Sequence, residues 1–317
     1  MDNKTKIAVL TPPFSKNEIL RKELSKHFKN VKHNLEGKNL MTQEEIIDFT
    51  GDSNGVIMGL ESFNKKVISK LPNLKIISKF GVGLDNVDLE YCKSRNIKLS
   101  YAPGVNKLSV AEQTLGFMIG LCRNLFFTSF KLKNGVWDKR GGVQLSEKTI
   151  GIIGVGNAGR EVIRLLKPFN CKILVNDIRP QKEYYKKNNL TESSKEGIYR
   201  KSDIVSIHVP LTSKTNHMIN EVTLKMMKPA AYLINTSRGA VVDTKSLKKA
   251  LKENWIKGAA IDVFEEEPIK DMELLSLPNL VPTPHIGGTG LESLLAMGRS
   301  AIKHLVVFFG KGKKNAK

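Results

Sequence analysis

The feature that most constrains the fold is a glycine pattern, Gly154, Gly156 and Gly159, between a predicted strand and a predicted helix. The preceding run, Thr149–Val155, is apolar and β-branched, as expected of a buried strand in a parallel sheet. Gly154 permits a tight turn, Gly156 leaves room for a pyrophosphate against bare backbone, and Gly159 lets the helix pack closely on the strand. The helix is predicted from about Asn157 to Lys167. Strand, loop and helix together predict a dinucleotide-binding site.

An acidic residue ends the next predicted strand. Cys171–Asn176 is largely apolar and leads to Asp177, eighteen residues after Gly159. A carboxylate at this position can accept hydrogen bonds from both ribose hydroxyls, and it repels a 2′-phosphate, which favours NAD over NADP as the cofactor. The alternative interpretation, a glycine-rich structural turn, leaves Asp177 without a role.

Length and composition limit the class of protein. At 317 residues, of which 40% are hydrophobic, the chain can bury a large core and suggests two domains. No apolar run approaches the ~20 residues of a membrane span. The polar N-terminus leads straight into a predicted strand, so we expect neither a membrane segment nor a signal peptide. Because Cys92, Cys122 and Cys171 lack metal-ligand spacing, we expect reduced thiols in the cytoplasm and no metal site.

The formal net charge of +20 leaves three interpretations open. Lysine can simply be the common surface residue of this chain, the charge can attract an anionic substrate and cofactor, or the surface can bind nucleic acid. The lysines are spread along the whole sequence between acidic residues, and no nucleic-acid-binding motif accompanies them. We therefore expect small anionic partners and no nucleic acid.

Residues 6–100 alternate short apolar strands with short helices, which predicts a small parallel α/β domain without a dinucleotide fingerprint. One of these strands, Leu74–Ser78, is followed by a loop that contains Gly81 and Gly83. The glycines allow a tight turn with free N–H groups at the carboxyl end of a strand, where open α/β sheets bind ligands. The loop is either an anion-binding loop or an ordinary turn.

Ser109–Glu112 has the spacing of a capping box and predicts the start of a helix. The helix that follows, up to about Phe127, is apolar on more than one side. It must therefore be buried from more than one direction, against a second domain, a dimer partner, or both.

Three polar residues follow predicted strand ends in the nucleotide-binding half: Arg238, Glu267 and His285. The carboxyl ends of parallel strands face the crevice that holds the cofactor. Arginine suits a substrate carboxylate because its planar fork binds bidentately and stays charged, and histidine suits proton transfer near neutral pH. Glu267 would pair with His285, favour the protonated ring and fix its orientation. Alternatively, each residue could be structural: a surface ion pair, an acid in a turn and a loop residue.

A second histidine competes for the role of base. His208 lies at the end of the predicted strand Ile204–Val209, beside Pro210. We interpret it as lining the cofactor crevice, and we expect His217 and His304 to be structural or exposed.

Six motifs, in order and over nearly the whole chain, resemble the D-isomer-specific 2-hydroxyacid dehydrogenase family, which includes phosphoglycerate dehydrogenase and glycerate, glyoxylate and hydroxypyruvate reductases. The motifs are Gly81-Val82-Gly83-Leu84-Asp85-Asn86-Val87-Asp88, Gly154-Val155-Gly156-Asn157-Ala158-Gly159, His208-Val209-Pro210-Leu211-Thr212, Asn235-Thr236-Ser237-Arg238-Gly239, Asp262-Val263-Phe264-Glu265-Glu266-Glu267-Pro268 and Pro284-His285-Ile286-Gly287-Gly288. The resemblance implies that Arg238 binds the substrate and that Glu267 and His285 form the acid/base pair.

The same resemblance implies further contacts. Val82 and Gly83 would offer backbone N–H groups to the substrate carboxylate. Besides the three glycines of the fingerprint and His208, the residues expected to line the NAD site are Asn157, Ala158, Asp177, Val209, Thr236, Asp262 and Gly287. The family is typically a homodimer built on the nucleotide-binding domain, in agreement with the helix that is apolar on more than one side.

The chain is therefore expected to form two α/β, Rossmann- or flavodoxin-like parallel-sheet domains with a cleft between them. Residues 1–102 and 289–317 would form the substrate-binding domain, and residues 103–288 the NAD-binding Rossmann domain. The expected reaction transfers a hydride between NAD(H) and C2 of a small D-2-hydroxy acid or 2-oxo acid, of the phosphoglycerate, glycerate or hydroxypyruvate, glyoxylate or lactate type. The alternative function is a non-catalytic NAD-sensing protein, like the corepressors that resemble this family.

One departure from the family bears on the substrate. Where phosphoglycerate dehydrogenases often carry an arginine after the third strand, this chain has Gly59-Leu60-Glu61. This difference argues against a phosphorylated substrate, unless Lys65, Lys66 or Lys79 compensates for the missing charge.

Overall fold

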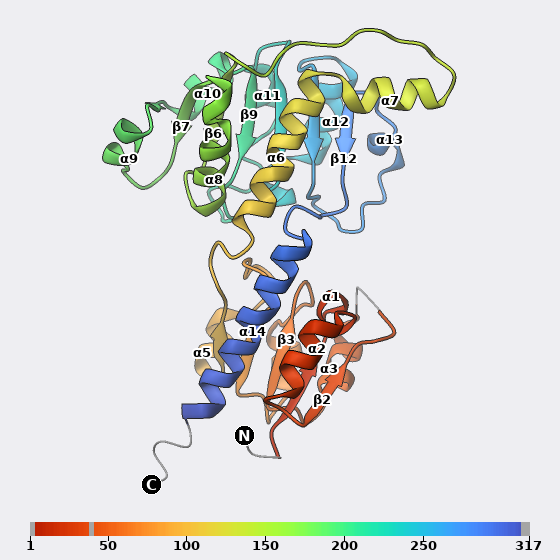
Figure 1. The fold of residues 1–317 in the computed structure, drawn as a ribbon, viewed down its shortest axis with the longest axis vertical. Coiled ribbons are helices and arrows are strands. Elements are labelled where there is room, and N and C mark those ends of the chain that lie inside the picture. Colours follow the sequence, from red (N-terminus) through yellow and green to blue (C-terminus); the bar gives the residue numbers. More distant parts are fainter. Residues whose placement is uncertain (1–3, 38–40, 312–317) are drawn as a thin grey trace. The chain divides into compact units, whose positions relative to one another are not determined.

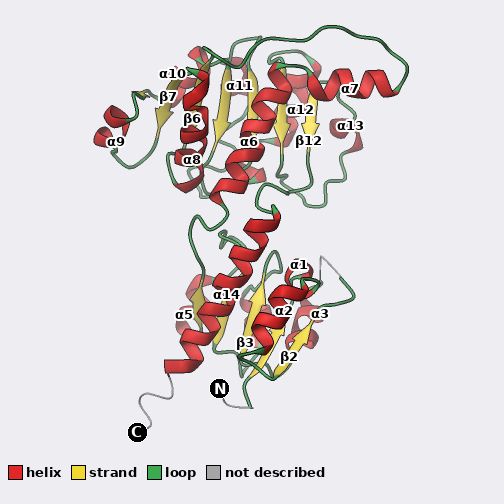
Figure 2. Cartoon of the chain, viewed as in Figure 1, coloured by secondary structure: helices red, strands yellow, loops and turns green. Residues whose placement is uncertain are grey.

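The computed structural model describes residues 4–37 and 41–311, and the chain divides into two compact units. The first unit runs up to Asn106 and resumes at Thr289, and the second unit is Lys107–Gly288. Each unit contains one parallel β-sheet with helices packed on it (Figure 1, Figure 2). The predicted fold class, two parallel-sheet α/β domains, is confirmed.

The first unit has a five-stranded sheet in the order β2-β1-β3-β4-β5, in which all neighbouring strands are parallel. The strands are β1 (Lys6–Val9), β2 (Asn30–His33), β3 (Gly55–Met58), β4 (Ile76–Lys79) and β5 (Lys98–Ser100). One face packs against α1 (Pro12–Ser15), α2 (Glu18–Ser25) and α14 (Leu291–Lys311), and the other against α3 (Gln43–Thr50), α4 (Lys65–Ser69) and α5 (Leu89–Ser94).

Strand β3 shows why this sheet is covered on both faces. All four of its residues are buried. Because successive side chains of a strand point to opposite faces, Val56 and Met58 join the cluster under α3 to α5, whereas Ile57 joins the cluster under α2 and α14. A continuous apolar run is therefore the expected sequence of this strand.

The second unit has a seven-stranded sheet in the order β12-β11-β10-β9-β6-β7-β8, again entirely parallel. The strands are β6 (Thr149–Ile153), β7 (Lys172–Asn176), β8 (Thr191–Glu192), β9 (Ile204–Ile207), β10 (Tyr232–Asn235), β11 (Gly258–Ile261) and β12 (Leu280–Pro282). One face packs against α6 (Lys107–Cys122) and α8 (Asn157–Leu166), and the other against α10 (Lys195–Lys201), α11 (Glu221–Lys225), α12 (Thr244–Lys252) and α13 (Met272–Leu275).

The strand order of the second sheet changes direction at β6. From β6 the chain continues to β7 and β8 on one side, and it then returns to the other side of β6 with β9 to β12. In open parallel sheets, ligands bind beyond the carboxyl ends of the strands at such a reversal. The loops that follow β6, β7 and β9 meet this requirement, because parallel strands end at the same edge of a sheet.

One sequence-based expectation about a helix was wrong. Helix α6 begins at Lys107, so Ser109 lies inside the helix rather than capping it, and its hydroxyl donates to Gly287 O at 2.7 Å. The basic stretch Lys182–Lys187 forms the short helix α9, which is anchored by the buried Tyr185.

Residues 125–144, which we call the arm, consist of α7 (Leu125–Lys133) and the irregular segment that leads back to β6 (Figure 1). None of the residues of α7 is buried. Seven large apolar side chains of the arm are exposed: Leu125, Phe126, Phe130, Leu132, Val136, Trp137 and Val143. Phe130 and Trp137 are 70% and 75% exposed, so the arm displays an apolar surface.

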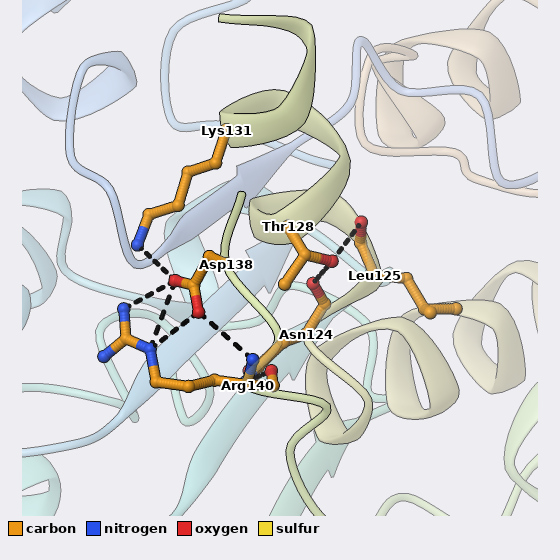
Figure 3. A network of polar contacts seen from close by, with 6 residues as sticks. All are labelled: Asn124, Leu125, Thr128, Lys131, Asp138 and Arg140. Atoms are coloured by element: carbon orange, nitrogen blue, oxygen red, sulfur yellow. Dashed lines mark hydrogen bonds and ion pairs between the residues drawn. The ribbon is translucent and has the colours of Figure 1, made fainter. Parts of the chain in front are cut away.

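Polar contacts give the arm a defined shape (Figure 3). The Asp138 carboxylate lies 2.7 Å from Lys131 Nζ and 2.7 Å from Arg140 Nη2. Asn124 Nδ2 donates to the carbonyl oxygen of Arg140 at 2.9 Å. Hydrogen bonds from Arg140 and Lys131 hold the pKa of Asp138 well below its usual range, so this carboxylate stays charged. Within the described residues, no helix is long and apolar enough to cross a membrane.

Candidate active site

The loop between β6 and α8 explains each glycine of the fingerprint. Gly154 has φ +97°, and a Cβ there would lie 2.4 Å from His208 O. A Cβ on Gly159 would lie 2.1 Å from Gly154 O, so only glycine allows α8 to start this close to the loop. A Cβ on Gly156, by contrast, would have no described atom within 4 Å. The first and third glycines are therefore needed for packing, and the second leaves open space beside bare backbone, which fits a bound pyrophosphate.

Asp177 follows β7 and faces the glycine loop. Its Oδ2 accepts the N–H of Val155 at 2.7 Å, and its Oδ1 accepts the N–H of Arg179 at 2.8 Å. An ionised carboxylate offers about four lone-pair sites, so two acceptor positions remain after these bonds. The carboxylate is thus held in place by backbone and retains the capacity to bind ribose hydroxyls.

His208, the second histidine considered as the base, has surroundings that keep its ring neutral. His208 Nε2 lies 2.9 Å from Ser206 Oγ, and Nδ1 is buried with no partner among the described residues. Burial lowers the pKa of His208 to about 4, so the ring is neutral at pH 7. A neutral, half-buried ring beside the glycine loop fits the expected lining of the cofactor crevice better than the role of acid. His304 is half-buried, 3.5 Å from Ser78 Oγ in the first unit.

The loop that carries Arg238 is shaped by a buried asparagine. Asn235, at the end of β10, accepts the N–H and the hydroxyl of Ser237 at 3.0 and 2.7 Å and donates to Arg238 O at 2.9 Å. A Cβ on Gly239 would lie 2.0 Å from Phe264 O, so the loop after β10 is in direct contact with the loop after β11. Glycine at 239 therefore brings Arg238 close to the segment that contains Glu267.

The three consecutive glutamates after β11 have three different partners. Glu265 pairs with His217, and Glu266 pairs with Lys270, four residues further along the chain. Only Glu267 reaches His285. The sequence alone could not distinguish these three carboxylates, because all of them lie in one short polar segment.

Glu267 and His285 form a direct pair. Glu267 Oε2 lies 2.7 Å from His285 Nδ1, and Glu267 Oε1 accepts the N–H of Phe264 at 2.9 Å. Burial raises the pKa of Glu267, but the hydrogen bond and charge of His285, the Phe264 N–H and the charge of Arg238 together leave it below its usual value. The carboxylate is therefore ionised at neutral pH. Because Arg238 acts on the same carboxylate, the structure brings Arg238, Glu267 and His285 together.

The remaining residues expected at the NAD site follow the carboxyl ends of strands in the second sheet. Asn157 and Ala158 begin α8, directly after the glycine loop. Val209 Cγ1 would lie 3.0 Å from a Cβ on Gly154, so this side chain packs on the glycine loop. Thr236 Oγ1 lies 3.0 Å from Thr114 Oγ1 of α6. Asp262 is 1% exposed, and its Oδ2 accepts the N–H of Gly287 at 2.8 Å.

One group of side chains in the described residues has the composition of a metal site. Ligand atoms of His217, Asp243 and Glu265 lie within 4.8 Å of one another. Protein groups already occupy them: Glu265 accepts the N–H of Thr244 at 2.9 Å, and Asp243 caps α12 through Ser246. We therefore interpret the cluster as a structural network, which agrees with the expected role of His217.

The expected substrate loop lies in the first unit, after β4. Gly81 has φ +140°, a conformation that favours glycine. In the described part of the chain, no hydrogen-bond acceptor is found for the N–H groups of Val82 and Gly83. Asn86 braces the loop, because its Nδ2 donates to Gly59 O at 3.0 Å and to Glu61 O at 2.7 Å. The loop therefore has the backbone donors of an anion site. The side chain of Asn86, at the end of the loop, holds it against residues 59–61.

Sequence reasoning did not identify the role of Ser109 or Gln113. Ser109 Oγ bonds to Gly287 O, and Gln113 Nε2 donates to Asp262 Oδ1 at 2.8 Å. One signal was present in the sequence: these two polar residues are four positions apart and therefore share one face of the helix. Their partners could not be inferred, because these lie more than 140 residues away in the chain.

The glycine loop, the acid after β7 and the strand reversal define a dinucleotide-binding protein. Comparison with known proteins narrows this class. Residues 115–287 match the profile of the D-isomer specific 2-hydroxyacid dehydrogenase, NAD binding domain. Glyoxylate reductase from Thermofilum pendens is 39% identical over 274 residues, which are 84% of this chain and 81% of that protein. The chain belongs to the D-isomer specific 2-hydroxyacid dehydrogenase family.

Other members agree with this assignment. D-3-phosphoglycerate dehydrogenase from Methanocaldococcus jannaschii is 38% identical over 263 residues, which are 81% of this chain and 50% of that protein. The crystal structure of D-lactate dehydrogenase from Aquifex aeolicus, complexed with NAD and lactic acid, superposes with a TM-score of 0.84 at 28% identity and covers 98% of this chain and 97% of that one. The protein is an NAD-dependent 2-hydroxyacid dehydrogenase, which confirms the predicted family, activity and cofactor.

Proposed function

We propose that the protein reduces a short, non-phosphorylated 2-oxo acid, of the glyoxylate or hydroxypyruvate type, to the D-2-hydroxy acid with NADH. The observation that carries this proposal is the pair of Glu267 Oε2 and His285 Nδ1 at 2.7 Å, on which the charge of Arg238 also acts. A hydrogen-bonded acid/base pair beside a guanidinium is what reduction of a 2-oxo acid requires. The domain that contains residues 107–288 would bind NAD, and the first unit would bind the substrate.

The chain's own residues supply binding and proton transfer. When NADH is bound, its nicotinamide supplies the hydride. Arg238 would bind the substrate carboxylate and would draw electron density from the carbonyl group. Because Glu267 occupies Nδ1 of His285, the proton would leave from Nε2 of the ring to the substrate oxygen. The ionised Glu267, which is hydrogen-bonded to Nδ1, would keep the orientation of the ring.

The surroundings of Lys79 support a substrate without a phosphate. Lys79 is 4% exposed, and its ammonium donates to Gly59 O and, at 2.7 Å, to Asn86 Oδ1. The neighbouring Glu61 is 5% exposed, and burial raises its pKa. A buried ammonium already engaged by protein oxygens, beside a carboxyl group, is poorly suited to bind a substrate phosphate. The glyoxylate reductase of Thermofilum pendens has a substrate of the proposed size.

The proposed substrate class can be tested with a panel of four 2-oxo acids. NADH oxidation would be measured with glyoxylate, hydroxypyruvate, pyruvate and phosphohydroxypyruvate. We expect kcat/KM for glyoxylate or hydroxypyruvate to exceed that for phosphohydroxypyruvate by at least about 10-fold, which corresponds to roughly 1.4 kcal/mol of transition-state binding. A preference for phosphohydroxypyruvate would refute the proposed substrate class. Binding of NADH without turnover of any of the four would instead favour the NAD-sensing function.

The role of His285 has its own test. The variant His285→Ala should lower kcat by about 10²- to 10⁴-fold, because it removes the general acid. Its Kd for NADH, measured by fluorescence, should stay close to that of the unmodified protein. Equal losses in kcat and in NADH affinity would remove His285 from the acid/base role.

We also propose that the protein is a homodimer that buries the arm. The arm exposes seven large apolar side chains on a segment whose shape is fixed by the contacts of Asp138 (Figure 3). Apolar patches of this kind are rare on monomers unless they form an interface. Trp137 and Phe130, the most exposed of the seven, would be central to the contact, since aromatic side chains dominate interface energetics.

A further inference from the structure

We propose that Gln113 is a positioning residue for His285 and that it acts through Asp262 and Thr283. The inference rests on the proposed catalytic role of His285. The hydrogen bonds from which it is argued are independent of that role. We call Ser109, Gln113, Asp262 and Thr283 the loop clamp. The first two belong to α6, Asp262 follows β11, and Thr283 begins the loop 283–288, which carries His285.

Gln113 contacts both other parts of the clamp. Its Nε2 donates to Asp262 Oδ1 at 2.8 Å and to Thr283 Oγ1 at 3.0 Å. The Thr283 hydroxyl donates in turn to Asp262 Oδ1 at 2.5 Å. The amide group of Gln113 thus joins α6 to Asp262, at the end of β11, and to Thr283, at the start of the loop that carries His285. Ser109 adds a second attachment one helical turn earlier, through Gly287 O.

Asp262 then fixes the backbone of His285 and of the two residues that follow it. Its Oδ1 accepts the N–H of Ile286 at 2.9 Å, and its Oδ2 accepts the N–H of Gly287 at 2.8 Å. The N–H of His285 itself donates to Asp262 O at 2.8 Å. A carboxylate that is 1% exposed needs these donors, because an uncompensated buried charge is strongly unfavourable.

The backbone of His285 shows why such a clamp is needed. His285 has φ +54°, in the left-handed region that residues other than glycine seldom adopt. A residue in this region persists when the surrounding structure over-determines it, and such residues cluster at functional sites. Among the described contacts, the hydrogen bonds from the loop to Asp262 hold the backbone of His285 in this conformation. Loss of a clamp donor should therefore let the loop relax and move the imidazole relative to Glu267.

Gln113 is suited to a test because its side-chain hydrogen bonds go to Asp262 and Thr283 rather than to His285 or Glu267. The variant Gln113→Leu removes the donor and keeps a side chain of similar size. Thr283→Val removes the clamp hydroxyl and serves as a second variant should Gln113→Leu not fold. Glu112→Gln is the matched control, since Glu112 is the exposed neighbour of Gln113 on the same helix.

The first measurement separates positioning from cofactor binding. With glyoxylate and NADH, Gln113→Leu should lower kcat by about 10- to 100-fold, because a small misplacement of a catalytic group has effects of this size. The Kd for NADH should change by less than about 3-fold, and Glu112→Gln should behave like the unmodified protein. A kcat within about 2-fold of the unmodified protein, or parallel losses of kcat and NADH affinity, would overturn the proposal.

A double-mutant cycle tests whether the effect passes through His285. In the His285→Ala background, the further change Gln113→Leu should alter the residual kcat by less than about 2-fold, since the group that it positions is absent. If the full loss recurs in that background, Gln113 acts elsewhere and the proposal fails.

A third readout does not depend on turnover. The chain has six histidines, and the imidazole NMR signals of His285 can be assigned by comparison with His285→Ala. In Gln113→Leu or Thr283→Val these signals should shift or broaden, and in Glu112→Gln they should not. Unchanged signals of His285 in both clamp variants would refute the clamp even if the protein reduces glyoxylate. Shifted signals in a protein that reduces no 2-oxo acid would refute the proposed function and leave the clamp standing.

Discussion

Replacing His208 with glutamine should flatten the pH dependence of the stability of the second unit between pH 6.5 and pH 4. His208 Nδ1 is buried without a partner in the described residues, and Nε2 lies 2.9 Å from Ser206 Oγ. Protonation of the folded protein would place a charge in this environment, and burial therefore lowers the pKa of His208 from 6.5 to about 4. In the unfolded chain the ring keeps its ordinary pKa. Between these values the unfolded state binds one more proton than the folded state.

The sign and size of the effect follow from that proton. Stability rises with pH wherever the unfolded state binds more protons, so acidification from pH 6.5 to pH 4 should destabilise the second unit. Each pKa unit corresponds to about 1.4 kcal/mol, and the full shift corresponds to about 3 kcal/mol by pH 4. In His208→Gln, which cannot be protonated, this part of the loss should be absent.

The assay is urea denaturation at pH 7, 6, 5 and 4, followed by tryptophan fluorescence. The only two tryptophans, Trp137 and Trp255, both belong to the second unit, so the signal reports on this unit alone. Comparison of the two proteins at each pH cancels the titration of groups that they share. His27→Gln, which replaces an exposed histidine of the first unit, is the control. Parallel pH profiles for His208→Gln and the unmodified protein, within about 0.5 kcal/mol, would refute the reasoning.

Two further predictions concern the cofactor and the arm. Asp177→Ala should raise the ratio of kcat/KM for NADPH over NADH by roughly 10- to 100-fold, since it removes both the ribose acceptor and the repulsion of a 2′-phosphate, and an unchanged ratio would contradict the role of Asp177. Phe130→Glu places a charge on the most exposed apolar side chain of α7 and should halve the mass measured by light scattering at micromolar protein, whereas Lys133→Glu on the same helix should not. A dimer that withstands Phe130→Glu, or a monomeric unmodified protein, would rule out the arm as the interface.

Much of the fold was predictable because its signals are local. The strand before Gly154, the packing needs of Gly154 and Gly159 and the acid at Asp177 depend on neighbours within a few residues or on one βαβ unit. The parallel sheets followed from short apolar runs that alternate with helices. Helix starts were less predictable: Ser109 matches a capping pattern but lies within α6, because its hydroxyl bonds to Gly287 instead.

The candidate site was predictable in its residue types and not in its pairings. Chain order placed Arg238, Glu267 and His285 after successive strands, whose carboxyl ends lie at one edge of a parallel sheet. The partner of each of the three glutamates depended on where His217 and Lys270 came to lie, which no local pattern records. The same holds for Lys79, a candidate phosphate ligand in the sequence that is engaged by Gly59 and Asn86 in the fold.

The sequence by itself determined the two parallel α/β units, the dinucleotide loop and the chemical groups available for catalysis, because these depend on side-chain periodicity and on backbone freedom at single positions. Only the tertiary structure decided which carboxylate meets His285, that His208 is a neutral ring with a buried Nδ1, and that Gln113 reaches Asp262 from another element. Hydrogen-bond partners and burial depend on residues that are far apart in the chain, and only packing of the whole unit brings them within bonding distance.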